Sequence, residues 1–136
     1  MTEQLFQIGI KSLIQNDEHQ ILLLKNKDYW DIPGGRIDQG EDIETTLLRE
    51  LNEEIGVNHI AQKQLWDVVK SVKQLPYGNM MTSLMLIVYR VQLPADQIPH
   101  SCEPGTTLHW VGPEEAADYL KNKYPGSFCQ AIAQLS

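Results

Sequence analysis

The sequence contains little cysteine, no excess of positive charge and no long apolar run. Its two cysteines, Cys102 and Cys129, lack the spacing of metal ligands and are too few for a disulfide framework, which favours a reduced, cytoplasmic setting. The formal net charge of -7 argues against a general affinity for nucleic acid or anionic membranes. An anionic substrate would therefore have to be met by local cations or by a bound metal.

Targeting and membrane segments are not expected. No apolar stretch approaches the roughly 20 residues that span a membrane. Near the N-terminus, Gln4, Gln7 and Lys11 interrupt the apolar residues and no small-residue cleavage site follows, so a signal peptide is not expected. The 136 residues suit a single domain over 1–136, which is long enough for a substantial core.

A helix is predicted over residues 43–55. Asp42 is a suitable N-cap because its carboxylate can accept hydrogen bonds from the free amides of the first turn. Gly56 suits the left-handed position that ends a helix. The apolar residues of this stretch share one arc of about 140°, and they are Ile43, Leu47, Leu48, Leu51 and Ile55.

Three glutamates lie on a neighbouring arc of the same helix. Glu50, Glu53 and Glu54 stand at positions i, i+3 and i+4, so their carboxylates share one face. Like charges at this spacing repel, and Arg49 is a single cation beside three anions. A hard divalent cation such as Mg²⁺ would compensate better, since it takes carboxylates and phosphates as ligands. Taken alone, the three glutamates fit a solvated acidic face better than a metal site.

The apolar pattern predicts the remaining elements. Strands are expected over residues 5–14, 21–24, 82–93 and 106–111, with a broken strand-rich stretch over 57–72. The strand over 21–24 is expected to pair antiparallel with the first. Loops are expected over 25–31, 73–80 and 94–105, and two further helices over 113–122 and 127–135. This order predicts an α/β fold in which a mixed sheet is sandwiched between helices.

Residues 35–57 resemble the Nudix box, the signature of the Nudix hydrolase family. The signature reads glycine, five residues, glutamate, seven residues, and then Arg-Glu-aliphatic-x-Glu-Glu-x-Gly-aliphatic. The positions that match it are Gly35, Glu41, Arg49, Glu50, Leu51, Glu53, Glu54, Gly56 and Val57. The Trp30-x-x-Pro33-Gly34-Gly35 entry and the Trp110-Val111 pair before a Glu-rich helix are also similar to the family. The resemblance spans most of the chain and implies the family's Nudix fold, an α/β/α sandwich.

The resemblance also implies hydrolysis of a nucleoside diphosphate linked to another group X. The usual cofactor is Mg²⁺, and sometimes Mn²⁺, which neutralises phosphate charge and activates water. The implied metal ligands are Glu50, Glu53, Glu54 and the Gly35 carbonyl. The implied catalytic residues are Glu53, Glu103 and Arg49. Arg49 would hold the carboxylates in place, and Glu103, in the loop over 94–105, or else Glu53 would act as general base. The alternative interpretation is that Glu103 is a mobile surface glutamate. Glu41, as ligand or as structure, and Gly56 complete the box.

Substrate contacts are expected from the loops around the box. The candidates for phosphates are Gly34, Arg36, Lys25 and Lys27, and those for stacking on a base are Tyr29, Trp30, Phe6 and Tyr77. The alternatives are a simple turn residue for Gly34, solvated surface cations, and aromatic rings that only pack in the core or at its rim. The small size resembles family members that convert nucleoside or deoxynucleoside triphosphates into a monophosphate and pyrophosphate. The alternatives are ADP-ribose, nucleotide sugars, isoprenoid diphosphates, dinucleoside polyphosphates, and a non-catalytic nucleotide-sensing module. The expected partner is a small nucleotide rather than a nucleic acid or a membrane, and a homodimer through the strand over 57–72 is left open.

Overall fold

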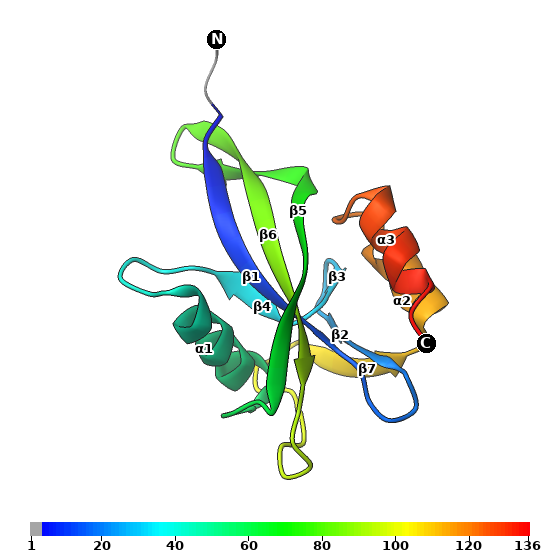
Figure 1. Cartoon of the computed structure of the whole chain (residues 1–136). Coiled ribbons are helices and arrows are strands. Elements are labelled where there is room, and N and C mark those ends of the chain that lie inside the picture. Colours follow the sequence, from blue (N-terminus) through cyan, green and yellow to red (C-terminus); the bar gives the residue numbers. More distant parts are fainter. Residues whose placement is uncertain (1–3) are drawn as a thin grey trace.

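The computed structural model describes residues 4–136, and two β-sheets occupy its centre (Figure 1). One sheet has the order β4-β1-β6-β5, formed by Gly34–Arg36, Phe6–Ile14, Met80–Gln92 and Gln62–Tyr77. The other has the order β3-β2-β7, formed by Trp30–Asp31, Ile21–Lys25 and Thr107–Val111. Helix α1 (Ile43–Ile55) covers one side, and α2 (Pro113–Leu120) and α3 (Gly126–Ala133) cover the other. The predicted α/β/α sandwich is confirmed.

Strand β2 connects the two halves of the core because both of its faces are buried. Ile21 and Leu23 pack into the cluster that contains Phe128 of α3, whereas Leu22 and Leu24 pack into the cluster that contains Leu51 of α1. This alternation is the period-2 pattern of a strand covered on both faces. No helix within the described residues is long and apolar enough to cross a membrane.

Helix α1 has the predicted bounds and both predicted ends. The Asp42 carboxylate accepts a hydrogen bond of 2.8 Å from the Thr45 amide. At the other end, Gly56 has φ 70°, and its amide donates to the Asn52 carbonyl at 3.1 Å. This bond is that of an αL helix end, and the Val57 amide also donates to the Leu51 carbonyl at 3.2 Å.

Gly56 is also a contact point for the loop over residues 94–105. A Cβ at Gly56 would lie 2.3 Å from Cε1 of His100. We expect Gly56→Ala to lower the free energy of unfolding by about 2 kcal/mol, since it adds this clash to the cost of a left-handed alanine. The matched control is Gly78→Ala, at φ 61° with open space around it, which should cost about 1 kcal/mol. Urea unfolding of both variants tests this, and equal losses would argue against the His100 contact.

The predicted antiparallel pairing of β2 with β1 is wrong. Strand β1 pairs in parallel with β6 and antiparallel with β4, while β2 pairs with β3 and β7. Among the described residues, a single antiparallel bridge, Gln15 with Ile21, joins the two where the chain turns. The Asn16 side chain shapes this turn by accepting from the amides of Glu18 and Gln20. The turn sends β2 into a second sheet, where both of its apolar faces find a core.

The predicted loop over residues 73–80 is also wrong, because the chain there forms a hairpin. Strand β5 continues to Tyr77, and β6 starts at Met80 after a two-residue turn at Gly78 and Asn79. Pro76 is tolerated because β5 is the edge strand of its sheet. The expected break in the strand is present as register shifts between Leu65 and Asp67 and between Lys70 and Gln74. A homodimer through this edge stays a prediction.

Two smaller boundaries differ from the prediction. The segment expected as a polar loop over residues 25–31 ends in strand β3, which pairs Lys25 with Trp30 and Leu24 with Asp31. Helices α2 and α3 end two residues before their predicted ends, at Leu120 and Ala133. Pairing with β2 extends Trp30 and Asp31 into a strand, and this long-range contact is not readable from local sequence.

Candidate active site

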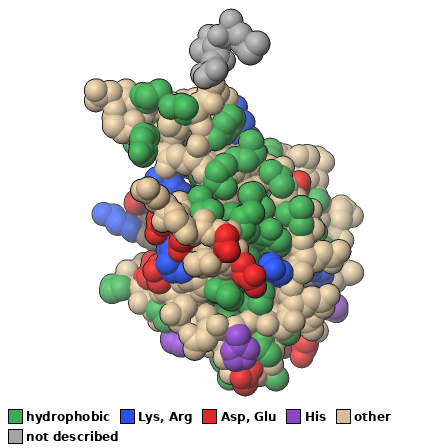
Figure 2. Space-filling model, turned by 60° about the vertical axis from the view of Figure 1, so that its left-hand side comes forward, with side chains coloured by type: hydrophobic (Ala, Val, Ile, Leu, Met, Phe, Trp, Pro, Cys, Tyr) green, Lys and Arg blue, Asp and Glu red, His purple; other side chains and the backbone are tan. Residues whose placement is uncertain are grey.

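A cleft of about 400 Å³ lies beside the N-terminal half of the box. Residues from all of the strands except β7 contribute to its walls, together with the C-terminal half of α1, the 94–105 loop, α2 and the α2–α3 link. Figure 2 shows acidic and basic side chains gathered next to a broad hydrophobic area on one face of the molecule. The polar and aromatic residues that line the cleft include Lys11, Tyr29, Trp30, Asp31, Gly34, Gly35, Arg36, Glu54, Lys73, Glu103, Tyr119 and Lys123.

Arg49 organises the carboxylates of the box. Its guanidinium makes a two-point pair with Glu41, through Nε to Oε2 at 2.7 Å and Nη2 to Oε1 at 2.9 Å. Its Nη1 donates to Glu50 at 2.8 Å and to Glu53 at 3.3 Å. These hydrogen bonds raise the pKa of Arg49, and the Arg49 bond lowers the pKa of Glu41 to about 2. Arg49 does not line the cleft, so it acts through the carboxylates it holds.

Glu54 is the box carboxylate that faces the cleft. Its Oε1 accepts a hydrogen bond of 2.7 Å from the Gly34 amide. Burial raises the pKa of Glu54 to about 7, against the attraction of Lys11 and the Gly34 hydrogen bond. Burial also raises the pKa of Glu50, which packs directly on the backbone of Gly35. Two carboxylates are thus held where ionisation is costly, an arrangement that a bound cation would relieve.

The shifted pKa of Glu54 has a consequence for the stability of the metal-free protein. Between about pH 4.5 and pH 7, folded Glu54 keeps a proton that the unfolded chain has released, so stability falls as the pH rises through this window. Glu54→Gln cannot ionise and should be more stable than wild type at pH 8 by about 2 kcal/mol, yet similar at pH 5. Thermal unfolding in EDTA at both pH values tests this. A stability difference that does not grow with pH would contradict it.

The 94–105 loop brings Glu103 to the same cleft. The His100 amide donates to the Ile55 carbonyl and the Cys102 amide to the Glu54 carbonyl, both at 3.0 Å. These bonds tie the loop to the last turn of α1. Glu103 is exposed at the cleft wall, and its charge is one of the smaller influences that raise the pKa of Glu54, after burial.

The oxygen ligands present suit a hard cation, although they are not gathered into a complete coordination site. Glu50 and Glu54 supply carboxylate oxygens next to the Gly35 backbone, the ligand type that Mg²⁺ prefers. Within residues 4–136, no three His, Cys, Asp or Glu side chains are grouped closely enough to hold one ion. Arg49 accounts for this, since it draws Glu50 and the half-exposed Glu53 toward Glu41. The predicted ligand set stays a prediction.

The substrate-binding candidates divide into those that line the cleft and those that do not. Tyr29, Trp30, Gly34 and Arg36 line it. Trp30 stacks on Tyr119 at 3.9 Å, and Tyr29 is 51% exposed at the rim. The four other candidates named from sequence do not line it: Tyr77, Phe6, Lys25 and Lys27. Tyr77 is 66% exposed at the tip of the β5–β6 hairpin, because the stretch that carries it is a strand end rather than a loop over the box.

The structure adds a buried polar group that the sequence analysis missed. The carboxylate of Asp31 accepts hydrogen bonds from Lys11 at 3.0 Å, Lys123 at 2.5 Å and Tyr124 at 2.6 Å. Asp31 and Lys11 are 6% and 5% exposed, and both line the cleft. The available signal was a lysine within an otherwise apolar strand, a residue type that is rarely buried without a partner.

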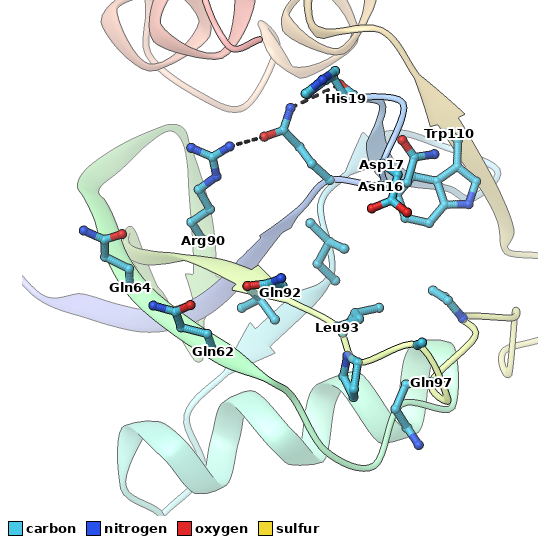
Figure 3. Close-up of a pocket in the computed structure, with 16 residues that line it drawn as sticks. Asn16, Asp17, His19, Gln62, Gln64, Arg90, Gln92, Leu93, Gln97 and Trp110 are labelled. Carbon is cyan, nitrogen blue, oxygen red and sulfur yellow. Dashed lines mark hydrogen bonds between the residues drawn. The ribbon is translucent and has the colours of Figure 1, made fainter.

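A second hollow, of about 550 Å³, lies at the C-terminal ends of β1 and β6 (Figure 3). Neutral amide side chains dominate its walls, among them Gln62, Gln64 and Gln92. Arg90 hydrogen-bonds Gln15, which in turn donates to the His19 carbonyl at 3.1 Å. None of the box carboxylates reaches this hollow, so the chemistry implied by the box belongs to the first cleft.

Comparisons with known proteins agree with this geometry. A protein provisionally named 8-oxo-dGTP diphosphatase from Bacillus subtilis (strain 168) is 48% identical over 52 residues, which cover 37% of this chain and 35% of that protein. An RNA pyrophosphohydrolase from Ruthia magnifica is 44% identical over 55 residues, covering 39% of this chain and 31% of that protein. The chain thus aligns with about a third of the length of each. Nucleoside triphosphatase NudI from Escherichia fergusonii is 29% identical over 119 residues, covering 81% and 84%.

Solved structures and a family model extend the match over the whole fold. The MutT NUDIX hydrolase from Burkholderia pseudomallei superposes with a TM-score of 0.68 at 25% identity, covering 98% of this chain and 100% of that one. The E. coli dihydroneopterin triphosphate pyrophosphohydrolase superposes with a TM-score of 0.72 at 18% identity, covering 96% and 97%, which shows the shared fold. A model of the NUDIX domain matches residues 5–130. The chain therefore belongs to the NUDIX domain family.

Proposed function

We propose that this chain is a divalent-metal-dependent pyrophosphohydrolase that cleaves a diphosphate bond in a small nucleotide. The substrate class we favour is a nucleoside or deoxynucleoside triphosphate, converted into a nucleoside monophosphate and pyrophosphate. The observation that carries this is the position of Glu54, a carboxylate held by the Gly34 amide in a cleft that also contains Glu103 and Trp30. The family membership of residues 5–130 supports the same reaction class.

Mg²⁺, or Mn²⁺ in its place, would be held by Glu50, Glu53, Glu54 and the Gly35 carbonyl. When bound, such an ion neutralises phosphate charge and lowers the pKa of the attacking water. Arg49 positions Glu50 and Glu53 through charge-assisted hydrogen bonds. Glu41 is the main partner of Arg49 and acts as structure rather than as a ligand, since both of its oxygens are used by the guanidinium.

Glu103 is the general base in this proposal. Its carboxylate lies on the cleft wall, on a loop fixed to Glu54 by the hydrogen bond from the Cys102 amide. There it can accept the proton that the attacking water releases. Glu53 is the alternative base, but its carboxylate is bonded to Arg49 and does not line the cleft. The pH dependence of kcat, measured for Glu103→Gln and for Glu53→Gln, distinguishes between these two candidate bases.

Cations and aromatic rings of the cleft would bind the rest of the substrate. Arg36 and Lys123 line the same cleft as Glu54 and can meet phosphate oxygens that the metal leaves free. Tyr29 and the Trp30–Tyr119 stack offer faces on which any nucleobase can lie. These contacts do not distinguish one nucleobase from another. The names of similar proteins, which include nucleoside triphosphatase NudI, favour a triphosphate.

A substrate panel tests this proposal. Purified protein with Mg²⁺ is incubated with nucleoside and deoxynucleoside triphosphates, ADP-ribose, nucleotide sugars, isoprenoid diphosphates and dinucleoside polyphosphates, and kcat/KM is measured for each. We expect the highest values among the triphosphates. A higher value for another class would move the substrate assignment to that class. Nucleotide binding without turnover of any compound would instead favour a sensing module.

A further inference from the structure

Lys11 is a buried cation whose three N–H donors all have acceptors within the protein. It lies in β1 and is 5% exposed. Its Nζ donates to Asp31 Oδ2 at 3.0 Å, to the Gly34 carbonyl at 3.2 Å and to the Ile32 carbonyl at 3.4 Å. An ammonium group has three donors, so the side chain is fully used. All three acceptors belong to the segment that leads into the Nudix box.

That segment presents the amide that holds Glu54. Gly34 has φ 141° and packs so closely on β1 that a Cβ would lie 2.1 Å from the Ile10 carbonyl oxygen. Its amide donates to Glu54 Oε1 at 2.7 Å, while its carbonyl accepts from Lys11. Glycine can adopt many backbone conformations, so the direction of this amide depends on restraints to either side of it. On one side, the Ser12 amide donates to the Pro33 carbonyl at 2.8 Å. On the other, Gly34 lies opposite Lys11 in the pairing of β1 with β4, and its carbonyl accepts from the Lys11 ammonium.

We propose that Lys11 is a positioning residue for the metal site. It fixes the carbonyl of Gly34, keeps the Gly34 amide aimed at Glu54, and thereby holds the Glu54 carboxylate toward the cleft. This inference rests on the proposed function in one respect, that Glu54 is a metal ligand. It adds a residue outside the box, on a different strand, to the set on which metal affinity depends.

The surroundings of Lys11 keep it charged and in place. Burial alone lowers the pKa of Lys11, but the charges of Asp31 and Glu54 outweigh it and the net pKa is raised. Asp31 is anchored by Lys123, Tyr124 and the Ile32 amide as well as by Lys11. Removing the Lys11 ammonium therefore leaves Asp31 with three partners, whereas the Gly34 carbonyl loses the side chain that holds it.

This asymmetry provides a matched pair of variants. Lys11→Met and Lys123→Met each remove one ammonium from the same Asp31 oxygen, but only Lys11→Met removes the side-chain donor of the Gly34 carbonyl. The readout is the Kd for Mn²⁺ alone, measured by isothermal titration calorimetry without substrate. Loss of an outer partner of a metal ligand commonly costs 10- to 100-fold in affinity. We expect Lys11→Met to raise the Kd about 10-fold or more and Lys123→Met to change it less than about twofold.

Each outcome bears on the inference. An unchanged or lower Kd in Lys11→Met, or an equal rise in both variants, would overturn it while leaving the proposed function standing. If wild-type protein bound no Mn²⁺, the proposed function and this inference would both fail. If circular dichroism showed that Lys11→Met does not fold, the double variant Lys11→Met/Asp31→Asn would be measured in its place. That variant removes the buried pair together, and the same rise in Kd is expected of it.

Discussion

Glu54→Gln is expected to lower kcat on the order of 10³-fold, which corresponds to about 4 kcal/mol in the activation free energy. The reason is specific to this carboxylate. The amide oxygen of glutamine can still accept the hydrogen bond from Gly34, so the local structure is kept. The negative charge that a metal ion needs is lost. Steady-state hydrolysis of the best substrate in the panel, at saturating Mg²⁺, measures the effect.

The matched control is Glu44→Gln, on the same helix. Glu44 lies in the first turn of α1 and is exposed, away from the cleft. The chemical change is identical, so kcat should stay within about twofold of wild type, with only the small loss of stability expected at a helix N-terminus. Similar rates in Glu54→Gln and Glu44→Gln would remove Glu54 from the site.

Arg49→Met is expected to reduce both stability and activity. The substitution keeps most of the side chain's volume but removes the guanidinium that Glu41, Glu50 and Glu53 share. Carboxylates left close together without a cation repel each other, so we expect the free energy of unfolding to fall by about 2 kcal/mol. Because the metal ligands would lose their alignment, kcat should fall about 10- to 100-fold. Urea unfolding and steady-state kinetics give the two values.

Arg90→Met is the control for that variant. Arg90 is an exposed arginine on β6 whose hydrogen bond goes to Gln15, in the amide-lined hollow rather than the cleft. Surface substitutions of this kind change stability by less than about 0.5 kcal/mol.

High Mg²⁺ should restore part of the activity of Arg49→Met, because the metal can replace the lost positive charge. An Arg49→Met enzyme with wild-type kcat would show that the carboxylates keep their positions without Arg49.

Local sequence rules predicted α1 accurately because both of its ends are set by local chemistry. The Asp42 cap and the left-handed Gly56 act within a few residues of the helix, and the apolar arc fixes its buried face. The pairing of the β-strands is harder to predict from local sequence. The sequence pattern identifies β2 as buried, but its pairing with β7 joins residues from opposite ends of the chain. Short local connections favour hairpins, and here the bend at Asn16 overrides that preference.

The residues of the candidate site also divide into those that local sequence predicts and those that only the folded structure brings together. The box glutamates could be named from spacing on one helix, since residues at i, i+3 and i+4 share a face. The closeness of Glu103 to Glu54 depends on backbone hydrogen bonds between residues separated by about a third of the chain, and Asp31 meets Tyr124 only in the folded protein. Tyr77 lies away from the cleft for a related reason. Its place was inferred from a loop that the structure replaces with a hairpin tip.

The central claim is that residues 35–57 form the metal-dependent centre of a pyrophosphohydrolase. The most direct test is product analysis by ion-exchange chromatography after incubation with a deoxynucleoside triphosphate, in Mg²⁺ and in EDTA, for wild type and Glu54→Gln. We expect the nucleoside monophosphate and pyrophosphate from wild type with Mg²⁺, and almost no product in EDTA or from the variant. Equal product formation in Mg²⁺ and EDTA, or by Glu54→Gln, would contradict it.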